Sequence, residues 1–81
     1  MIYERRLRYF SGTGVWVASA RYEWRWGKDE GWSVGGQSAY TDLERRFAPD
    51  GLIEQWAEQR ADRLASNALC AAFGVRREDM R

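Results

Sequence analysis

The stretch Val15–Trp26, VWVASARYEWRW, alternates between two kinds of side chain. Its even-numbered positions hold three tryptophans, one tyrosine and two alanines. Its odd-numbered positions hold two valines, a serine, a glutamate and two arginines. Because successive side chains of a strand point to opposite faces, this period of two predicts a strand. One face of that strand is aromatic, and the other carries the arginines.

A second strand is predicted over residues 2–10, which are rich in aromatic and branched side chains. The turn sequence SGTG separates it from the first strand and favours a hairpin. A hairpin that turns on Gly12 and Thr13 pairs residues whose numbers sum to 25. Tyr9 then faces Trp16, so the aromatic side chains of both strands fall on the same face.

A third strand is predicted over residues 32–40, WSVGGQSAY, after the five-residue loop GKDEG. Pairing Trp26 with Trp32 gives residue numbers that sum to 58. In this register Tyr22 faces Gly36, and an aromatic ring over a cross-strand glycine stabilises a sheet. The apolar side chains of the third strand again share the aromatic face.

The remainder of the chain carries helix signals. Thr41 and Glu44 fit a capping box, which predicts a short helix over 42–48. Proline interrupts it, and Asp50 is placed to cap a second helix. That helix is predicted over 52–73, with Gly74 as its stop. Its inner face on a helical wheel consists of Ile53, Ala57, Ala61, Leu64, Ala68 and Ala71.

These elements predict an α+β fold, a three-stranded antiparallel meander of order 1-2-3 packed on one long C-terminal helix (βββα). The whole chain, 1–81, forms one domain. It has a sheet over 2–40, a helical part over 42–73 and a charged tail over 75–81 that frays. Because the inner face of the helix is mostly alanine, we expect the aromatic rings of the sheet to supply most of the core.

The composition argues against catalysis and against bound cofactors. The chain has no histidine, the commonest general base and a frequent metal ligand. Its single cysteine, Cys70, cannot form a zinc site alone and lies among alanines, so we expect a buried structural thiol. Pairs of carboxylates fall in a turn and on the polar face of the helix, where solvation explains them. We expect neither an enzyme nor a metal or cofactor protein.

The net charge is only +1. No apolar run approaches the length of a membrane helix, and the start lacks the apolar segment of a signal peptide. A single thiol suits a reducing compartment. We therefore expect a soluble protein of the cytoplasm, with no membrane partner.

The candidate working surface is the sheet face opposite the rings. Arginine beside flat apolar area is typical of the centres of protein interfaces. In the predicted register Glu4 faces Arg21. The candidate partner-binding residues are Arg6, Arg8, Arg21, Glu23, Arg25 and Gln37. The alternative is that these charges merely keep an exposed sheet face soluble.

Leu69 and Phe73 point away from the predicted alanine face, so they either contact a partner or pack on Phe47 or the tail. The first and third strands are open edges, and arginines guard the first. These features permit a homodimer whose sheet continues across a symmetry axis.

In size and layout the chain resembles the small phage-encoded anti-CRISPR proteins. The similarity lies in the meander VWVASARYEWRW–GKDEG–WSVGGQSAY and the following helix GLIEQWAEQRADRLASNAL. It implies a non-catalytic inhibitor that sterically blocks a host nucleoprotein complex. The likeness is architectural, and it carries over no functional residue.

The order of strands and helix is also similar to that of the AP2 and integrase-type DNA-binding domains. Here WVASARYEW and WSVGGQSAY match the second and third strands of those domains loosely. This alternative implies that arginines of the sheet contact bases and phosphates in the major groove. The single lysine, the net charge and the acidic helix argue against it.

Overall fold

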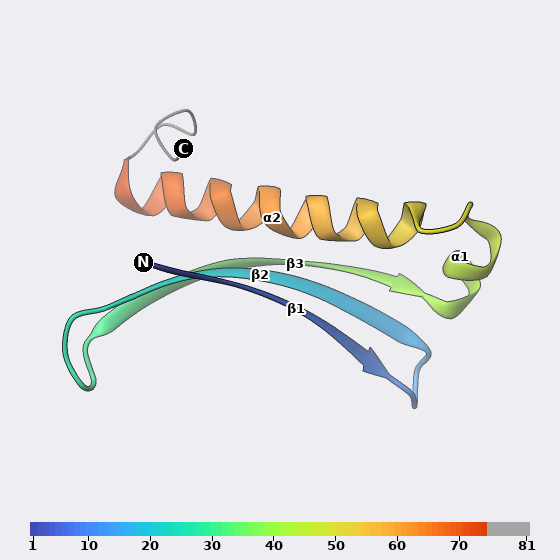
Figure 1. The fold of residues 1–81 in the computed structure, drawn as a ribbon, viewed down its shortest axis with the longest axis horizontal. Helices are drawn as coiled ribbons and strands as arrows, with labels where there is room; N and C mark the ends of the chain where they lie inside the picture. The colour runs from blue at the N-terminus through green and yellow to red at the C-terminus, as the bar shows by residue number, and fades with distance from the viewer. Residues whose placement is uncertain (75–81) are drawn as a thin grey trace.

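The computed structural model describes residues 1–74, and the predicted tail 75–81 lies outside this range. The elements are β1 (Ile2–Phe10), β2 (Val15–Arg25), β3 (Gly31–Thr41), α1 (Asp42–Phe47) and α2 (Leu52–Phe73). The strands form one antiparallel sheet of order β1-β2-β3, and α2 packs on one of its faces (Figure 1). The predicted α+β fold and strand order are confirmed.

The β1–β2 hairpin has the predicted register, with Tyr9 opposite Trp16. The strands separate after Phe10, whose carbonyl oxygen accepts from the backbone N–H groups of Thr13 and Gly14 at 3.1 and 2.9 Å. Gly14 has φ +64°, a conformation that glycine adopts without steric cost. The turn therefore depends on Gly14 as well as on the two residues at its tip.

The β2–β3 register differs from the prediction by two residues. Trp24 faces Trp32, and Ala20, not Tyr22, faces Gly36. The shift is even, so every side chain keeps its predicted face.

The cause of this shift lies above the sheet. A Cβ added to Gly36 would lie 2.8 Å from the backbone nitrogen of Ala65 and 2.9 Å from the carbonyl oxygen of Ala61. The backbone of α2, and not an aromatic ring, covers this glycine. The register is therefore the one that brings the smallest residues of the sheet beneath the helix.

The capping box of α1 forms as predicted. The Thr41 hydroxyl accepts from the Glu44 backbone N–H at 3.1 Å, and the Glu44 carboxylate accepts from the Thr41 N–H at 3.2 Å. The prediction for Asp50 is wrong, because the residue before α2 is Gly51, in a left-handed conformation with no side-chain cap. At the other end, Gly74 stops α2 as predicted and donates its N–H to the Cys70 carbonyl oxygen.

The buried face of α2 follows a line that the helical wheel did not select. Leu64 and Ala71 are exposed and Ala68 is half-buried, contrary to the prediction. A row of every fourth residue rotates about the helix by roughly 40° per step, and such a row stays in contact with a twisted sheet. A fixed face on the wheel misses it. The buried residues are Ala57, Ala61, Ala65 and Leu69.

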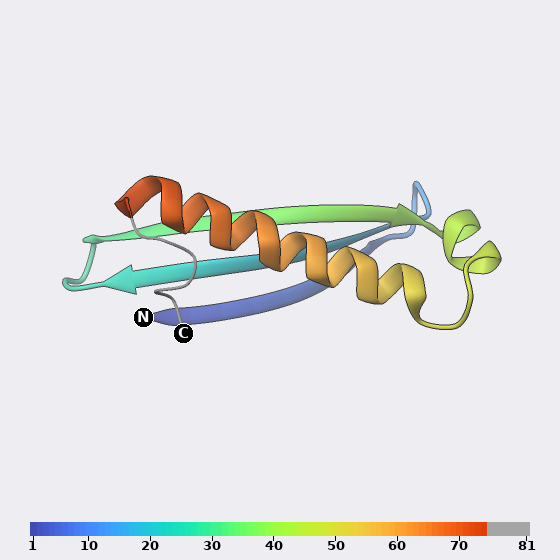
Figure 2. The ribbon, with the colours of Figure 1, turned by 90° about the horizontal axis from the view of Figure 1, so that it is seen from above.

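The centre of the core consists of small residues rather than rings. Tyr40 is the largest fully buried side chain among the described residues, and the other buried members of the central cluster are alanines. Trp16 and Tyr22 are half-buried beside them, and Trp24 is 46 % exposed. Figure 2 shows why: α2 runs over β2 and β3 and leaves much of β1 uncovered. The expectation that rings supply most of the core is therefore wrong.

The end of α2 also corrects a prediction. Leu69 belongs to the buried row, and the ring of Phe73 packs on Trp32 with 4.5 Å between centroids. Leu69 is therefore part of the core, and Phe73, which is 47 % exposed, packs on Trp32 and not on Phe47. The predicted alternative, packing on the tail 75–81, lies outside the described residues. Cys70, predicted to be buried, is half-buried. No helix within residues 1–74 has the length and apolar character needed to cross a membrane.

Candidate docking surface

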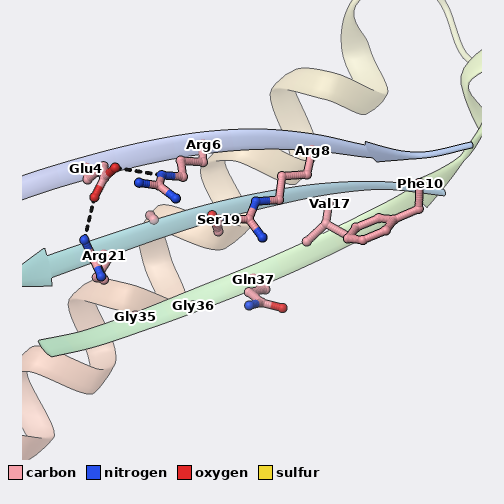
Figure 3. Close-up of a pocket in the computed structure, with 11 residues that line it drawn as sticks. Glu4, Arg6, Arg8, Phe10, Val17, Ser19, Arg21, Gly35, Gly36 and Gln37 are labelled. Atoms are coloured by element: carbon pink, nitrogen blue, oxygen red, sulfur yellow. Dashed lines mark hydrogen bonds and ion pairs between the residues drawn. The ribbon is translucent and has the colours of Figure 1, made fainter.

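The candidate surface is the sheet face that α2 does not cover. The strands bow away from α2 towards both ends, so this face is hollowed along their length (Figure 1). A depression of about 600 Å³ lies at its centre. We call it the arginine groove; its main lining residues are Arg6, Arg8, Phe10, Val17, Arg21 and Gln37 (Figure 3).

Glu4 links two arginines at one end of the groove. Its carboxylate accepts from Arg6 Nε at 2.7 Å and from Arg21 Nη2 at 2.6 Å. These two hydrogen bonds, that from Arg6 first, lower the pKa of Glu4 below its ordinary value. The predicted pairing of Glu4 with Arg21 is present, and Glu4 holds both guanidinium groups in place.

Glu23 links a second pair of arginines. Its side chain accepts from Arg25 and lies 3.0 Å from Arg21 Nη2. The residue is only 8 % exposed. Glu23 was predicted to contact a partner, but its burial suits it to position Arg21 and Arg25 instead.

Arg8 differs from the other arginines of this face. Within the described part of the chain its guanidinium has no hydrogen bond or ion pair. Figure 3 shows its side chain extending from β1 across β2, near Val17 and Ser19. Val17 is its cross-strand neighbour, and Phe10 lines the same groove. Within residues 1–74, Arg8 is therefore an unpaired cation beside apolar surface.

The corrected register also changes the neighbours of Gln37. It faces Ser19, whereas Arg21 faces Gly35. Small residues opposite the long ones leave room for the depression between them. Gln37 is exposed and stays on the predicted face.

Four of the six candidate residues line the arginine groove together: Arg6, Arg8, Arg21 and Gln37. Arg25 lies outside it, in a shallower hollow of about 410 Å³ beside the loop that contains Lys28 and Asp29. The sequence placed all six on one face correctly. It did not reveal that, among the four arginines of this face, Arg8 alone has no carboxylate partner in the described part of the chain, because that depends on where each side chain ends.

A second polar cluster joins α1 to the β1–β2 hairpin. Asp42 accepts from the Tyr9 hydroxyl at 2.5 Å and from Trp16 Nε1 at 2.8 Å. These bonds, that from Tyr9 first, lower the pKa of Asp42. The Arg45 guanidinium lies over the Trp16 ring, 4.8 Å from its centroid. Exposed hydrogen bonds of this kind fasten two elements and suggest no reaction.

No group of three or more histidine, cysteine, aspartate or glutamate side chains in residues 1–74 is arranged to hold a metal ion. Comparison with known protein families, curated proteins and solved structures gives no significant match. The chemistry of the arginine groove is therefore the basis for a functional proposal.

Proposed function

We propose that this protein is a non-catalytic binding module that docks on an acidic patch of a partner protein through the arginine groove. The observation that carries the proposal is Arg8, whose guanidinium has no ion pair within residues 1–74 and is flanked by Val17 and Phe10. A hydrogen bond to a charged group contributes about 1.5–3 kcal/mol once its surroundings are dry. A partner that brings a carboxylate to Arg8 would gain this hydrogen bond. If it also covers Val17 and Phe10, it would gain the burial of their apolar surface.

The pre-ordering of the neighbouring arginines supports the same proposal. Glu4 and Glu23 fix Arg6 and Arg21 before any partner arrives. Arginine has five N–H donors, and a bond to one carboxylate leaves others available. Side chains that are already fixed lose less conformational entropy on binding.

The charge balance favours a protein partner over DNA. Arg6, Arg8, Arg21 and Arg25 against Glu4 and Glu23 give the outer face a net charge of 4 − 2 = +2. The loop at one end adds two acids to one lysine, and the turn at the other end carries no charge. Duplex DNA is bound mainly through phosphates, so a rim of basic side chains is expected around a groove that reads it. This rim has none.

The resemblance to anti-CRISPR proteins makes a host nucleoprotein complex the first partner to test. Binding to an acidic protein surface of such a complex would block it sterically, without any reaction. The proposal requires only that the contact be made by protein and not by nucleic acid.

The test places a photo-crosslinking amino acid at Gln37, inside the groove, in cells that carry the gene. The matched control places it at Gln59, an exposed position on α2. We expect a defined protein adduct from position 37 alone, and we expect Arg8→Glu to abolish it. The same adducts from both positions, or an adduct that survives Arg8→Glu, would contradict the proposal.

The second measurement is a titration with duplex DNA at low and high salt. A docking module for protein should bind DNA weakly at both concentrations. Tight binding that weakens steeply with salt and is lost in Arg8→Glu would instead assign the groove to DNA.

A further inference from the structure

The two free edges of the sheet are guarded very differently. β1 carries Glu4 and three arginines along its length. β3, Gly31–Thr41, has eleven residues, and none of them is charged or proline. An exposed edge strand presents unpaired backbone groups, and charges or proline normally protect it against pairing. β3 has no such protection.

The two sides of α2 differ in charge in the same way as the two edge strands. Towards β1, Asp62 accepts from Tyr3 and Arg5, and Glu58 lies 3.8 Å from Arg5. The residues that precede the buried alanines must lie on the opposite flank, above the edge of β3. Trp56 and Leu64 on this flank are apolar and exposed. Leu52, which precedes the half-buried Ile53, is exposed on the same side, and we call these three residues the apolar flank. Arg60, which precedes Ala61, is a charged residue on the same side of α2, and its guanidinium lies over the Trp56 ring.

We propose that β3 pairs with β3 of a second copy of this chain, so that two sheets join into one sheet of six strands. The partner chemistry follows from the edge itself. A two-fold axis brings identical residues together, so an edge can meet its own copy only if its charges do not repel. An uncharged edge satisfies this condition. Pairing of β1 with its own copy in full overlap would place Arg6 against Arg6 of the partner on the axis.

The register of the pairing follows from full overlap of the two strands. Eleven residues overlap completely when Gly36 lies on the axis, so that paired numbers sum to 72 and Gly31 faces Thr41 of the partner. A ladder of this length forms about ten backbone hydrogen bonds, as many as a typical protein interface contains. Leu64 packs directly above Gly36, so the two copies of this leucine would meet across the axis and close the apolar flank.

This inference does not depend on the arginine groove, because it concerns the protein without any partner. In this register Ser33 faces Ala39 of the partner on the outer face, and both residues are exposed. S33K/A39K places two lysines opposite each other at two symmetric points. S33K/A39E has the same two sites but sets a lysine opposite a glutamate. The pair of variants thus tests the edge and the register together.

The measurement is sedimentation equilibrium over a dilution series, with circular dichroism to verify folding of each variant. We expect the wild type to dimerise, at twice the 9.5 kDa of one chain. S33K/A39K should weaken the dimer by roughly two- to thirtyfold, because like charges face each other at two cross-strand pairs. S33K/A39E should dimerise at least as well as the wild type. A wild type that stays monomeric, or two variants that dimerise equally, would overturn the inference.

Discussion

Gly36 offers the sharpest test of the packing between helix and sheet. A Cβ at this position would lie 2.8 and 2.9 Å from backbone atoms of Ala65 and Ala61. The nearest atom is the Leu64 Cβ, at 2.4 Å, which is fixed to the helix backbone. Ordinary contacts between non-bonded heavy atoms are about 3.5 Å or more, so α2 would have to move away by roughly 1 Å. Backbone atoms of a helix cannot yield individually. Gly36→Ala must therefore loosen the whole contact.

The expected cost combines two opposing effects. Overpacking of a core costs about 1–3 kcal/mol, whereas replacing glycine by alanine in a strand recovers about 0.5–1 kcal/mol of conformational entropy. We expect Gly36→Ala to lower the free energy of unfolding by about 1–2 kcal/mol, and Tm by roughly 5–15 °C for a chain of this size. Urea unfolding followed by far-ultraviolet circular dichroism measures this directly.

Gly12→Ala is the matched control, because an added Cβ there meets no atom within 4 Å and its φ is not positive. It should change stability by less than about 0.5 kcal/mol. If Gly36→Ala proved as stable as the wild type or more so, α2 could not lie directly on this glycine, and the β2–β3 register would have to be reconsidered.

Two further predictions concern the polar contacts that fasten the helices to the sheet. The lowered pKa of Asp42 means that its contribution to stability is complete above the ordinary carboxyl pKa and is lost as the pH falls through the lowered value. Urea unfolding over an acid pH series measures the difference in free energy of unfolding between the wild type and Asp42→Asn. This difference should narrow as the pH falls, because at low pH both proteins lack the bonds from Tyr9 and Trp16 to an ionised carboxylate. A difference that stays constant with pH would refute this. Asp62→Asn weakens the link between α2 and β1 and should cost about 1 kcal/mol or less. In Asp62→Asn, backbone hydrogen exchange measured by mass spectrometry should be faster than in the wild type in β1 but not in β3. The same change in both strands would count against a link between Asp62 and β1.

The strands, the long helix and the two faces of the sheet were predictable because each depends on a local period or turn. Val15–Trp26 keeps strict alternation, and the SGTG turn set the first register. The second register was not predictable from the GKDEG loop, since a five-residue loop permits more than one pairing. It follows from the need to place Gly36 beneath α2, which is a tertiary contact.

The same limit applies to the buried row of α2. A helical wheel assumes a straight contact line, and it therefore chose Leu64 and Ala71 over Ala65 and Leu69. The candidate surface was predictable in part. Parity alone placed its six residues on one face, but only the positions of the side-chain ends separate Arg8 from the arginines that Glu4 and Glu23 neutralise.

We propose that Arg8 anchors a partner protein in the arginine groove. Isothermal titration calorimetry with the partner identified by crosslinking tests it, with Arg63→Glu as the control. Arg63 is exposed on α2 and has no ion pair within residues 1–74. Its replacement by glutamate changes the net charge of the protein by the same amount as Arg8→Glu. We expect Arg8→Glu to weaken binding of the partner by about tenfold or more. Arg63→Glu should leave the affinity unchanged. Equal affinities for the two variants would contradict it.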